Sequence, residues 1–138
     1  MERTFFIIKP DAVQRGLVGQ IISRIEHRGF TISDLKMMTA KEDLIAAHYD
    51  HLTDKPFFPQ LVDYMTSGPL IAGILNGPEV VTSWRAMMGA TNPVNALPGT
   101  IRGDLATAPL DGNVKNAVHG SDCAEAAERE IRLWLGDK

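Results

Sequence analysis

The chain has 138 residues, of which 44% are hydrophobic, and this favours one domain, residues 1–138, with a substantial core. Its formal net charge of −3 argues against a broad nucleic-acid-binding surface, which usually requires a basic patch. Cys123 is the single cysteine, which excludes an intramolecular disulfide and suits a reducing compartment. No apolar run reaches the roughly 18 residues of a membrane span, so we expect a soluble protein of the cytoplasm.

Strand-like and helical patterns alternate along the first 88 residues. β-Branched and aromatic residues, or continuous apolar runs, indicate strands, and apolar residues at helical spacing indicate helices. The strand around Leu35 has a slip in its alternation, and Pro78 suits the first turn of a helix. The expected elements are a strand at 4–8, a helix at 17–27, a strand at 30–38, helices at 41–51 and 59–66, a strand at 69–75 covered on both faces, and a helix at 78–88.

The segment 89–115 has a different composition. It contains Pro93, Pro98 and Pro109 with little periodicity, and so long a loop in a small domain is usually functional. A short strand at 117–118 and a helix at 122–135 follow. This order predicts an α/β (α+β) fold, a ferredoxin-like sandwich. We expect a four-stranded antiparallel sheet with helices against one face and a long loop before the last strand.

His119 is the leading candidate for a catalytic residue, because it lies where the last strand is expected to meet the last helix. An imidazole can act as a nucleophile when a carboxylate holds one ring nitrogen and leaves the other free. Glu130, on the edge of the last helix's apolar face, is either that carboxylate or an exposed flanking residue. Gly120 would let a ligand approach, and Ser121 or Asp122 is a suitable N-cap. No metal-ligand spacing surrounds His119, so covalent catalysis is favoured over a buried structural histidine.

Several cationic and hydroxyl side chains are candidates for phosphate binding. Arginine grips phosphate oxygens bidentately and lysine supplies a point charge, although any one of them could be an ordinary surface residue. Neither standard glycine-rich phosphate-binding fingerprint occurs, so side chains would have to hold the phosphates. The candidates are Lys9, Arg85, Thr91 and Arg102.

Aromatic residues offer a place for a base. Phe57 and Phe58 lie between two prolines, so one of them is expected to face solvent or a ligand, and Phe57 is a candidate stacking ring. Packing into the core is the alternative. Tyr49 would reach a phosphate or cap its helix. Cys123, just past the expected N-cap, is interpreted as a spectator. The other histidines are expected at the surface: His27, His48 and His51.

Together these residues resemble the nucleoside diphosphate kinase family. Six separated segments match in the family's order, nearly from end to end, which is far more specific than a single short motif. The matching segments are KPDAVQRG (9–16), KPFF (55–58), MTSGP (65–69), GATNP (89–93), PGTIRGD (98–104) and NAVHGSD (116–122).

The resemblance implies ping-pong transfer of a γ-phosphoryl group from a nucleoside triphosphate, typically ATP, to a nucleoside diphosphate through a phosphohistidine. His119 matches the nucleophile, Glu130 the carboxylate that orients it, and Ser121 the hydroxyl beside that contact. Mg²⁺ would enter on the nucleotide with few or no direct protein ligands, and the protein would be a homo-oligomer, a tetramer or a hexamer. The other matches are Lys9 and Asn116 for the sugar 3′-hydroxyl, Tyr49, Arg85, Thr91 and Arg102 for the phosphates, and Phe57 for the base.

Two departures from the family pattern stand out. The loop at 105–115 is longer than the usual spacing, which leaves base preference and assembly open, and Cys123 replaces the more usual serine. Two alternative functions are compatible with parts of the sequence. One is a nucleotide-binding scaffold that has lost transfer. The other is an RNA-binding domain, because Arg28-Gly29-Phe30 begins like its aromatic signature. Thr31-Ile32 breaks that signature, and the acidic balance argues against it.

Overall fold

The computed structural model describes residues 1–108 and 115–138. The four strands form one antiparallel sheet in the order β2-β3-β1-β4, which confirms the predicted fold class. A bulge between Ile32 and Asp34 explains the slip in the alternation of the second strand. The strands are β1 (Glu2–Ile8), β2 (Thr31–Met38), β3 (Leu70–Gly77) and β4 (Val118–Gly120).

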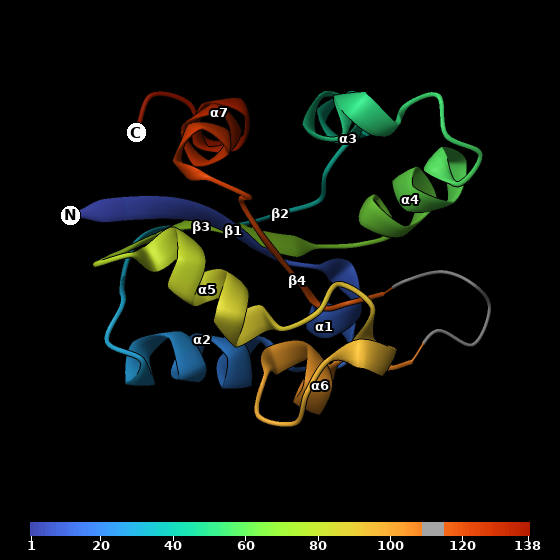
Figure 1. The fold of residues 1–138 in the computed structure, drawn as a ribbon. Helices are drawn as coiled ribbons and strands as arrows, with labels where there is room; N and C mark the ends of the chain where they lie inside the picture. Colours follow the sequence, from blue (N-terminus) through green and yellow to red (C-terminus); the bar gives the residue numbers. More distant parts are fainter. Residues whose placement is uncertain (109–114) are drawn as a thin grey trace.

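Helices cover both faces of this sheet (Figure 1), so the prediction of helices on one face is wrong. We call the side of the sheet covered by α3, α4 and α7 the α7 face, and the side covered by α2, α5 and α6 the α5 face. The helices are α1 (Pro10–Gln14), α2 (Val18–His27), α3 (Glu42–His48), α4 (Phe58–Met65), α5 (Val80–Met88), α6 (Ile101–Leu105) and α7 (Ala124–Leu135), with short 3₁₀ helices η1 (Asp50–Leu52) and η2 (Pro93–Asn95).

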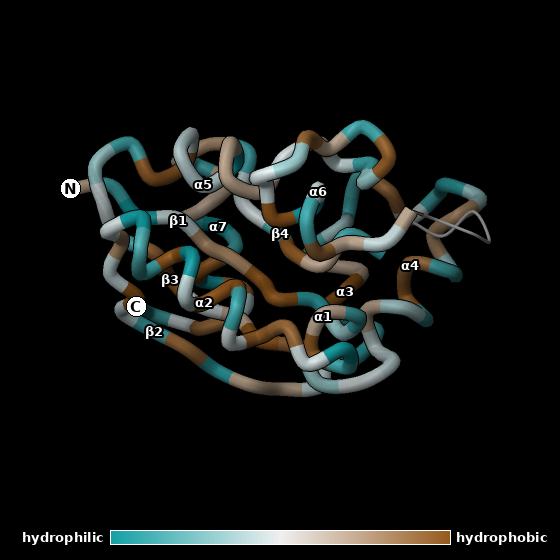
Figure 2. The backbone as a smooth tube through the Cα atoms, turned by 90° about the horizontal axis from the view of Figure 1, so that it is seen from below, coloured by the Kyte–Doolittle hydropathy of each residue, from teal (hydrophilic) through white to brown (hydrophobic). Residues whose placement is uncertain are grey.

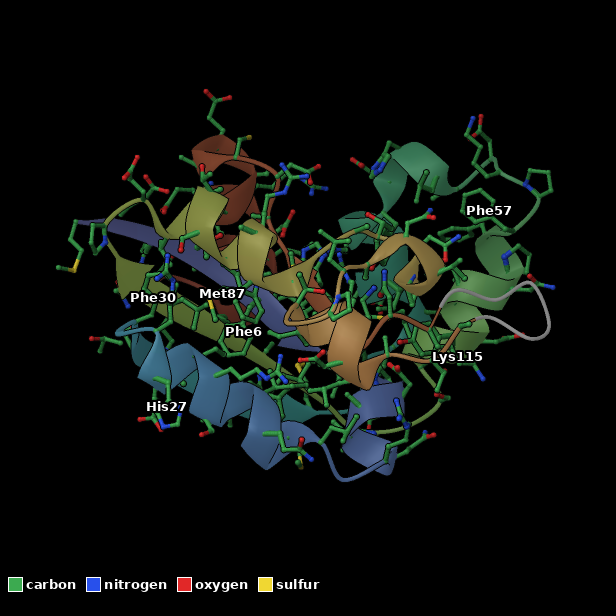
Figure 3. The ribbon with its side chains drawn as sticks, turned by 60° about the horizontal axis from the view of Figure 1, so that its bottom comes forward. Phe6, His27, Phe30, Phe57, Met87 and Lys115 are labelled. Carbon is green, nitrogen blue, oxygen red and sulfur yellow. The ribbon has the colours of Figure 1, made fainter. Side chains whose placement is uncertain are left out.

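The central strands carry apolar side chains to both faces, because successive residues of a strand point to opposite sides. Phe6 and Phe30 belong to the core on the α5 face (Figure 3). Phe5 and Ile7 pack with Trp134 in the core on the α7 face. The residues of β1 from Phe5 to Ile8 are accordingly hydrophobic (Figure 2). A strand that is buried on both sides needs a layer of helices on each side, and for this reason the helices lie on both faces of the sheet rather than on one.

Two predicted boundaries of helices and loops differ from the structure. The helix expected from Pro78 begins at Val80, after Glu79 in a left-handed conformation with φ of 51°. The segment 89–115, expected to be a loop, contains η2 and α6. Thr100 caps α6 by accepting a hydrogen bond from the Gly103 N–H. With five residues, α6 is too short to show a helical period in the sequence.

The last strand and helix also lie differently from the prediction. β4 spans 118–120 rather than 117–118, so His119 is inside the strand. The last helix has Cys123 as its N-cap rather than Ser121 or Asp122, and the Cys123 Sγ accepts a hydrogen bond from the Ala126 N–H at 3.5 Å. The expected helix at 41–51 divides at Tyr49 into α3 and η1.

Most of the lengthened loop at 105–115 lies outside the described residues, which omit 109–114. Its expected role at the base or at a subunit contact therefore stays a prediction. Across the described ranges, no helix has both the length and the apolar character that crossing a bilayer requires.

Candidate active site

His119 is placed by the register of β4 against β1. It pairs with Ile7, and residues directly opposite each other in an antiparallel pair point to the same face of the sheet. Because Ile7 packs on the α7 face, the His119 side chain faces α3 and α7. Gly120, expected to admit a ligand, is also required by packing, since a Cβ there would lie 2.5 Å from Trp84 Cδ1.

Glu130 lies on the inward stripe of α7, not on a solvated flank. The buried residues of this helix include Ala127, Glu130 and Trp134, which follow helical spacing. The His119 Nε2 and the Glu130 Oε1 are 2.7 Å apart, and the Ser121 hydroxyl donates to the same Oε1 at 2.9 Å. Glu130 thus holds one ring nitrogen of His119, and Nδ1 is the other.

The charge state of His119 is set by opposing effects. Burial lowers the pKa of the imidazole, the hydrogen bond and charge of Glu130 raise it, and the cations Lys9 and Arg102 lower it. The net shift is downward from 6.5. His119 is therefore mainly neutral at pH 7, which leaves a ring nitrogen with a free lone pair, as nucleophilic attack requires.

A strained turn before β4 brings Asn116 to Lys9. Ala117 has a φ of 72°, and the Val118 N–H donates to the Asn116 carbonyl at 2.8 Å, which closes a γ-turn. The Asn116 side chain accepts from Lys9 Nζ at 2.8 Å and donates to the Thr91 carbonyl at 2.9 Å. Burial, with the nearby Arg102 charge, lowers the pKa of Lys9 to about 7, against the opposing effect of Asp11.

Arg102 connects three segments beneath the site. Its guanidinium donates to the carbonyls of Asn116 at 3.2 Å, Gly89 at 3.0 Å and Val118 at 2.8 Å. Arginine carries five N–H donors, so two of them have no partner among the described residues and could serve a ligand. Although burial lowers the pKa of Arg102 to about 10, the side chain stays charged at pH 7.

The predicted site residues converge on one cavity of about 640 Å³, with the exception of Ser121 and Phe57. Ser121 is fully buried behind Glu130, and Phe57 is 49% exposed at the N-terminal end of α4 (Figure 3). Arg85 lies at the rim, 3.8 Å from a carboxylate oxygen of Asp122. Burial and the Glu130 charge raise the pKa of Tyr49 in the cavity wall, so its hydroxyl stays protonated and can donate.

His48 was expected at the surface, and this prediction is wrong. It is 4% exposed, lines the cavity, and lies three residues after buried Ile45 on the inward side of α3. Its ring centroid is 4.6 Å from that of His119, with the planes at 74°. The three-residue spacing from Ile45 is the sequence signal that places His48 on the inward side of the helix.

One group of side chains in the site has the composition of a metal centre. Ligand atoms of His48, His119 and Glu130 lie within 4.8 Å of one another. Their hydrogen bonds compete with metal binding, because Glu130 Oε1 is bonded to two partners and His48 Nδ1 accepts from the Trp134 indole at 2.9 Å. We interpret the group as a hydrogen-bonded cluster.

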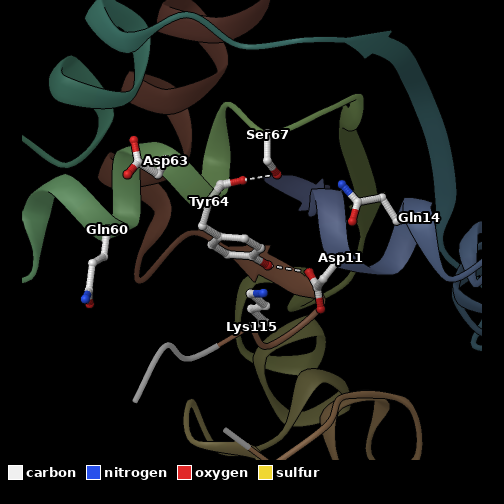
Figure 4. A pocket seen from close by; sticks show the side chains of 7 residues that line it. All are labelled: Asp11, Gln14, Gln60, Asp63, Tyr64, Ser67 and Lys115. Carbon is white, nitrogen blue, oxygen red and sulfur yellow. Dashed lines mark hydrogen bonds between the residues drawn. The ribbon is translucent and has the colours of Figure 1, made fainter. Parts of the chain in front are cut away.

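A second cavity, of about 320 Å³, lies between α1 and α4 (Figure 4). On its wall the Tyr64 hydroxyl donates to the Asp11 carboxylate. The Ser67 hydroxyl donates to the Tyr64 carbonyl at 2.6 Å. The bond between Tyr64 and Asp11 connects α4 to α1. Because α1 begins directly after Lys9, this bond helps to hold Lys9 in place.

Comparison with known proteins agrees with this geometry. The family model described as nucleoside diphosphate kinase matches residues 2–138. A nucleoside diphosphate kinase of Streptococcus agalactiae serotype V is 58% identical over 138 residues, which cover 99% of this chain and all of the relative. One of Streptococcus thermophilus is 56% identical over 137 residues, again covering 99% of this chain and all of the relative.

Solved structures give the same result. An apo nucleoside diphosphate kinase of Encephalitozoon cuniculi has a TM-score of 0.93 at 44% identity, covering 99% of this chain and 90% of that one. A halophilic nucleoside diphosphate kinase of Halobacterium salinarum, in complex with CDP, has a TM-score of 0.92 at 45% identity, covering 99% and 88%. These likenesses leave no support for the RNA-binding alternative. The chain therefore belongs to the nucleoside diphosphate kinase family and is an enzyme of that class.

Proposed function

We propose that the protein transfers the γ-phosphoryl group of a nucleoside triphosphate, typically ATP, to a nucleoside diphosphate through a phosphohistidine at His119. The observation that carries this proposal is the 2.7 Å contact of His119 Nε2 with Glu130, which leaves Nδ1 as the nucleophilic nitrogen of a partly buried, mainly neutral imidazole. An oriented imidazole of this kind also favours an active enzyme over an inactive scaffold.

The reaction has two half-steps. In the first, the Nδ1 lone pair of His119 attacks the γ-phosphorus, the bond to the bridging oxygen breaks, and the nucleoside diphosphate leaves with the bonding electrons. In the second, a terminal oxygen of the acceptor diphosphate attacks the same phosphorus, and the N–P bond breaks. Glu130 stabilises the positive charge that the ring acquires while Nδ1 is phosphorylated.

Cationic and hydroxyl side chains of the cavity are proposed to hold the nucleotide. Arg102 offers its two unused N–H donors to phosphate, and Arg85, Tyr49 and Thr91 are placed around the same cavity. The Lys9–Asn116 pair is proposed to hydrogen-bond the sugar 3′-hydroxyl. Because the pKa of Lys9 is lowered to about 7, an approaching polyphosphate would also favour its charged form.

Phe57, an exposed ring outside the cavity lining, is proposed to stack on the base. Stacking reads little of the base edge, which suits a broad nucleotide range. The relative from Halobacterium salinarum was solved with CDP, a nucleoside diphosphate, and this supports the proposed substrate class.

Mg²⁺ is proposed to enter on the nucleotide phosphates. Among the described residues of the cavity wall, the carboxylates are Glu130, occupied by His119 and Ser121, and Asp122 at the rim. This donor set fits a metal whose ligands are mainly phosphate oxygens and water. When bound, Mg²⁺ would neutralise part of the phosphate charge.

A cytoplasmic homo-oligomer, tetrameric or hexameric, completes the proposal. The edge strand β2 exposes Leu35 (48%) and Met37 (61%), and apolar side chains on an unpaired edge are suited to a partner. Light scattering after size-exclusion chromatography would test this, with Met37→Lys expected to reduce the assembly. A wild-type monomer would contradict it.

The decisive experiment is incubation with γ-labelled ATP and Mg²⁺ without acceptor, followed by a GDP chase. We expect an acid-labile, base-stable label that GDP discharges as GTP and that His119→Ala does not acquire. Nucleotide binding by His119→Ala, measured by calorimetry, should persist and serves as the folding control. A label that GDP cannot remove, or none at all, would support the scaffold alternative.

A further inference from the structure

We infer that His48 and Trp134 form a second support for His119. In this support Trp134 holds His48 as its Nε2–H tautomer, and the His48 ring fixes the orientation of the His119 ring. This role rests on the proposed function, because it takes His119 as the phosphoryl acceptor. His48 is thereby a positioning residue, and Trp134 acts through it.

The tautomer follows from the hydrogen bond. The Trp134 indole N–H can only donate, and it lies 2.9 Å from His48 Nδ1 in a buried setting. Nδ1 must therefore accept with its lone pair, and the ring hydrogen of the neutral imidazole is on Nε2. Protonation of His48 would place a second N–H opposite the indole N–H and break this contact.

The surroundings of His48 keep it neutral. Burial has the largest effect, and His119, Lys9, Arg129 and His51 add to it, lowering the pKa of His48 to about 2. A neutral neighbour matters for His119, because a cation at a ring-centroid distance of 4.6 Å would oppose the positive charge that the phosphorylated ring carries.

The His48 ring restricts the rotation of the His119 ring, which the hydrogen bond to Glu130 leaves free. A single hydrogen bond at Nε2 fixes one atom of the His119 ring, whereas the terminal ring torsion of histidine has a broad energy minimum. The edge-to-face packing of His48, with Phe5 at a centroid distance of 6.0 Å, limits the plane of the His119 ring. Nδ1 is thus held in line for attack, which is a matter of orientation and not of binding.

Trp134→Phe tests this chain of contacts, because it keeps an aromatic ring and removes the donor. Nitrogen-15 NMR of the histidine rings should show His48 as the pure Nε2–H tautomer in wild type and as a mixture of the two neutral tautomers in the variant. Trp84→Phe is the matched control. It removes the other indole donor, which bonds the His119 carbonyl at 3.2 Å, and should leave the His48 tautomer unchanged.

The functional readout is the single-turnover rate of His119 phosphorylation by γ-labelled ATP, measured by rapid quench. We expect Trp134→Phe to be slower by about 10-fold and His48→Ala by about 100-fold, with unchanged nucleotide dissociation constants, because misorientation costs rate rather than affinity.

A Trp134→Phe protein with an unchanged His48 tautomer would overturn the inference, as would an altered tautomer with a wild-type rate. If His48→Ala does not fold, Trp134→Phe alone decides. Failure of the proposed function has a different signature, namely wild-type protein that takes no label or His119→Ala that still takes it.

Discussion

The deep part of the cavity and its rim differ in how their side chains are held. In the deep part, Glu130 and Ser121 secure His119, and Asn116 secures Lys9, through hydrogen bonds of 2.7 to 2.9 Å between largely buried groups. At the rim, the Arg85 side chain is 53% exposed and lies 3.8 Å from its carboxylate partner.

We expect the two sets of side chains to contribute differently to the chemical step and to the affinity for a ligand. Buried, charge-assisted hydrogen bonds already made in the free protein cost no reorganisation during reaction, so they favour the chemical step. Exposed pairs contribute little by themselves, about 0–1 kcal/mol, and their side chains are free to rearrange around a ligand. We therefore expect substitutions in the deep part to change rate or folding, and substitutions at the rim to change affinity.

The largest effect is expected at Arg102, which holds the deep part together. Arg102→Met should lower the free energy of unfolding by about 3 kcal/mol or more, because three carbonyls lose a charged donor. Urea denaturation would measure this. Arg3→Met, which removes an exposed ion pair with Glu128, is the control and should cost under about 1 kcal/mol. Equal decreases in the free energy of unfolding for Arg102→Met and Arg3→Met would contradict this prediction.

Glu130→Gln tests whether the deep part acts on rate. The amide keeps the shape but carries no charge to stabilise the phosphorylated His119, so we expect kcat to fall by about 100-fold with little change in nucleotide affinity. Steady-state kinetics with calorimetry separates the two quantities. Glu128→Gln, on the exposed side of the same helix, is the matched control. Unchanged turnover in Glu130→Gln would assign the carboxylate a structural role.

Phe57→Ala tests an exposed side chain that lies outside the cavity lining. With half of its surface exposed, the ring contributes little to folding, but loss of stacking should weaken nucleotide binding by about 1–3 kcal/mol, which corresponds to a rise in KM of roughly 5- to 150-fold. The turnover number should stay close to wild type. Phe58→Ala, on the adjacent half-buried residue, should instead affect stability. A lower kcat with unchanged KM in Phe57→Ala would contradict the division between exposed side chains, which affect affinity, and buried ones, which affect rate.

A pH dependence of stability is also expected, and it comes from His48. The unfolded state binds a proton at His48 below its ordinary pKa of 6.5, whereas the folded state does so only near a pKa of about 2. The free energy of unfolding should thus fall on acidification through this window, by up to about 1.4 kcal/mol per pH unit. Urea denaturation at several pH values would show it. His48→Gln should remove this part of the slope, and identical slopes would refute the assignment.

The sequence was most informative where chemistry needs particular residue types in order along the chain. The six matching segments indicated the family, and the predicted site residues converge on one cavity apart from Ser121 and Phe57. Continuous apolar runs likewise located β1 and β3. Short elements such as α6 could not be predicted, because five residues span too few turns to show a period.

The sequence by itself determined the family, the fold class and the identity of the side chains available for chemistry, since these depend on local pattern and order. Only the tertiary structure decided that Glu130 points inward, that Ala117 takes a left-handed conformation, and that His48 is buried against Trp134. Those features depend on contacts between segments far apart in the chain, where packing and desolvation outweigh the local preference of each residue.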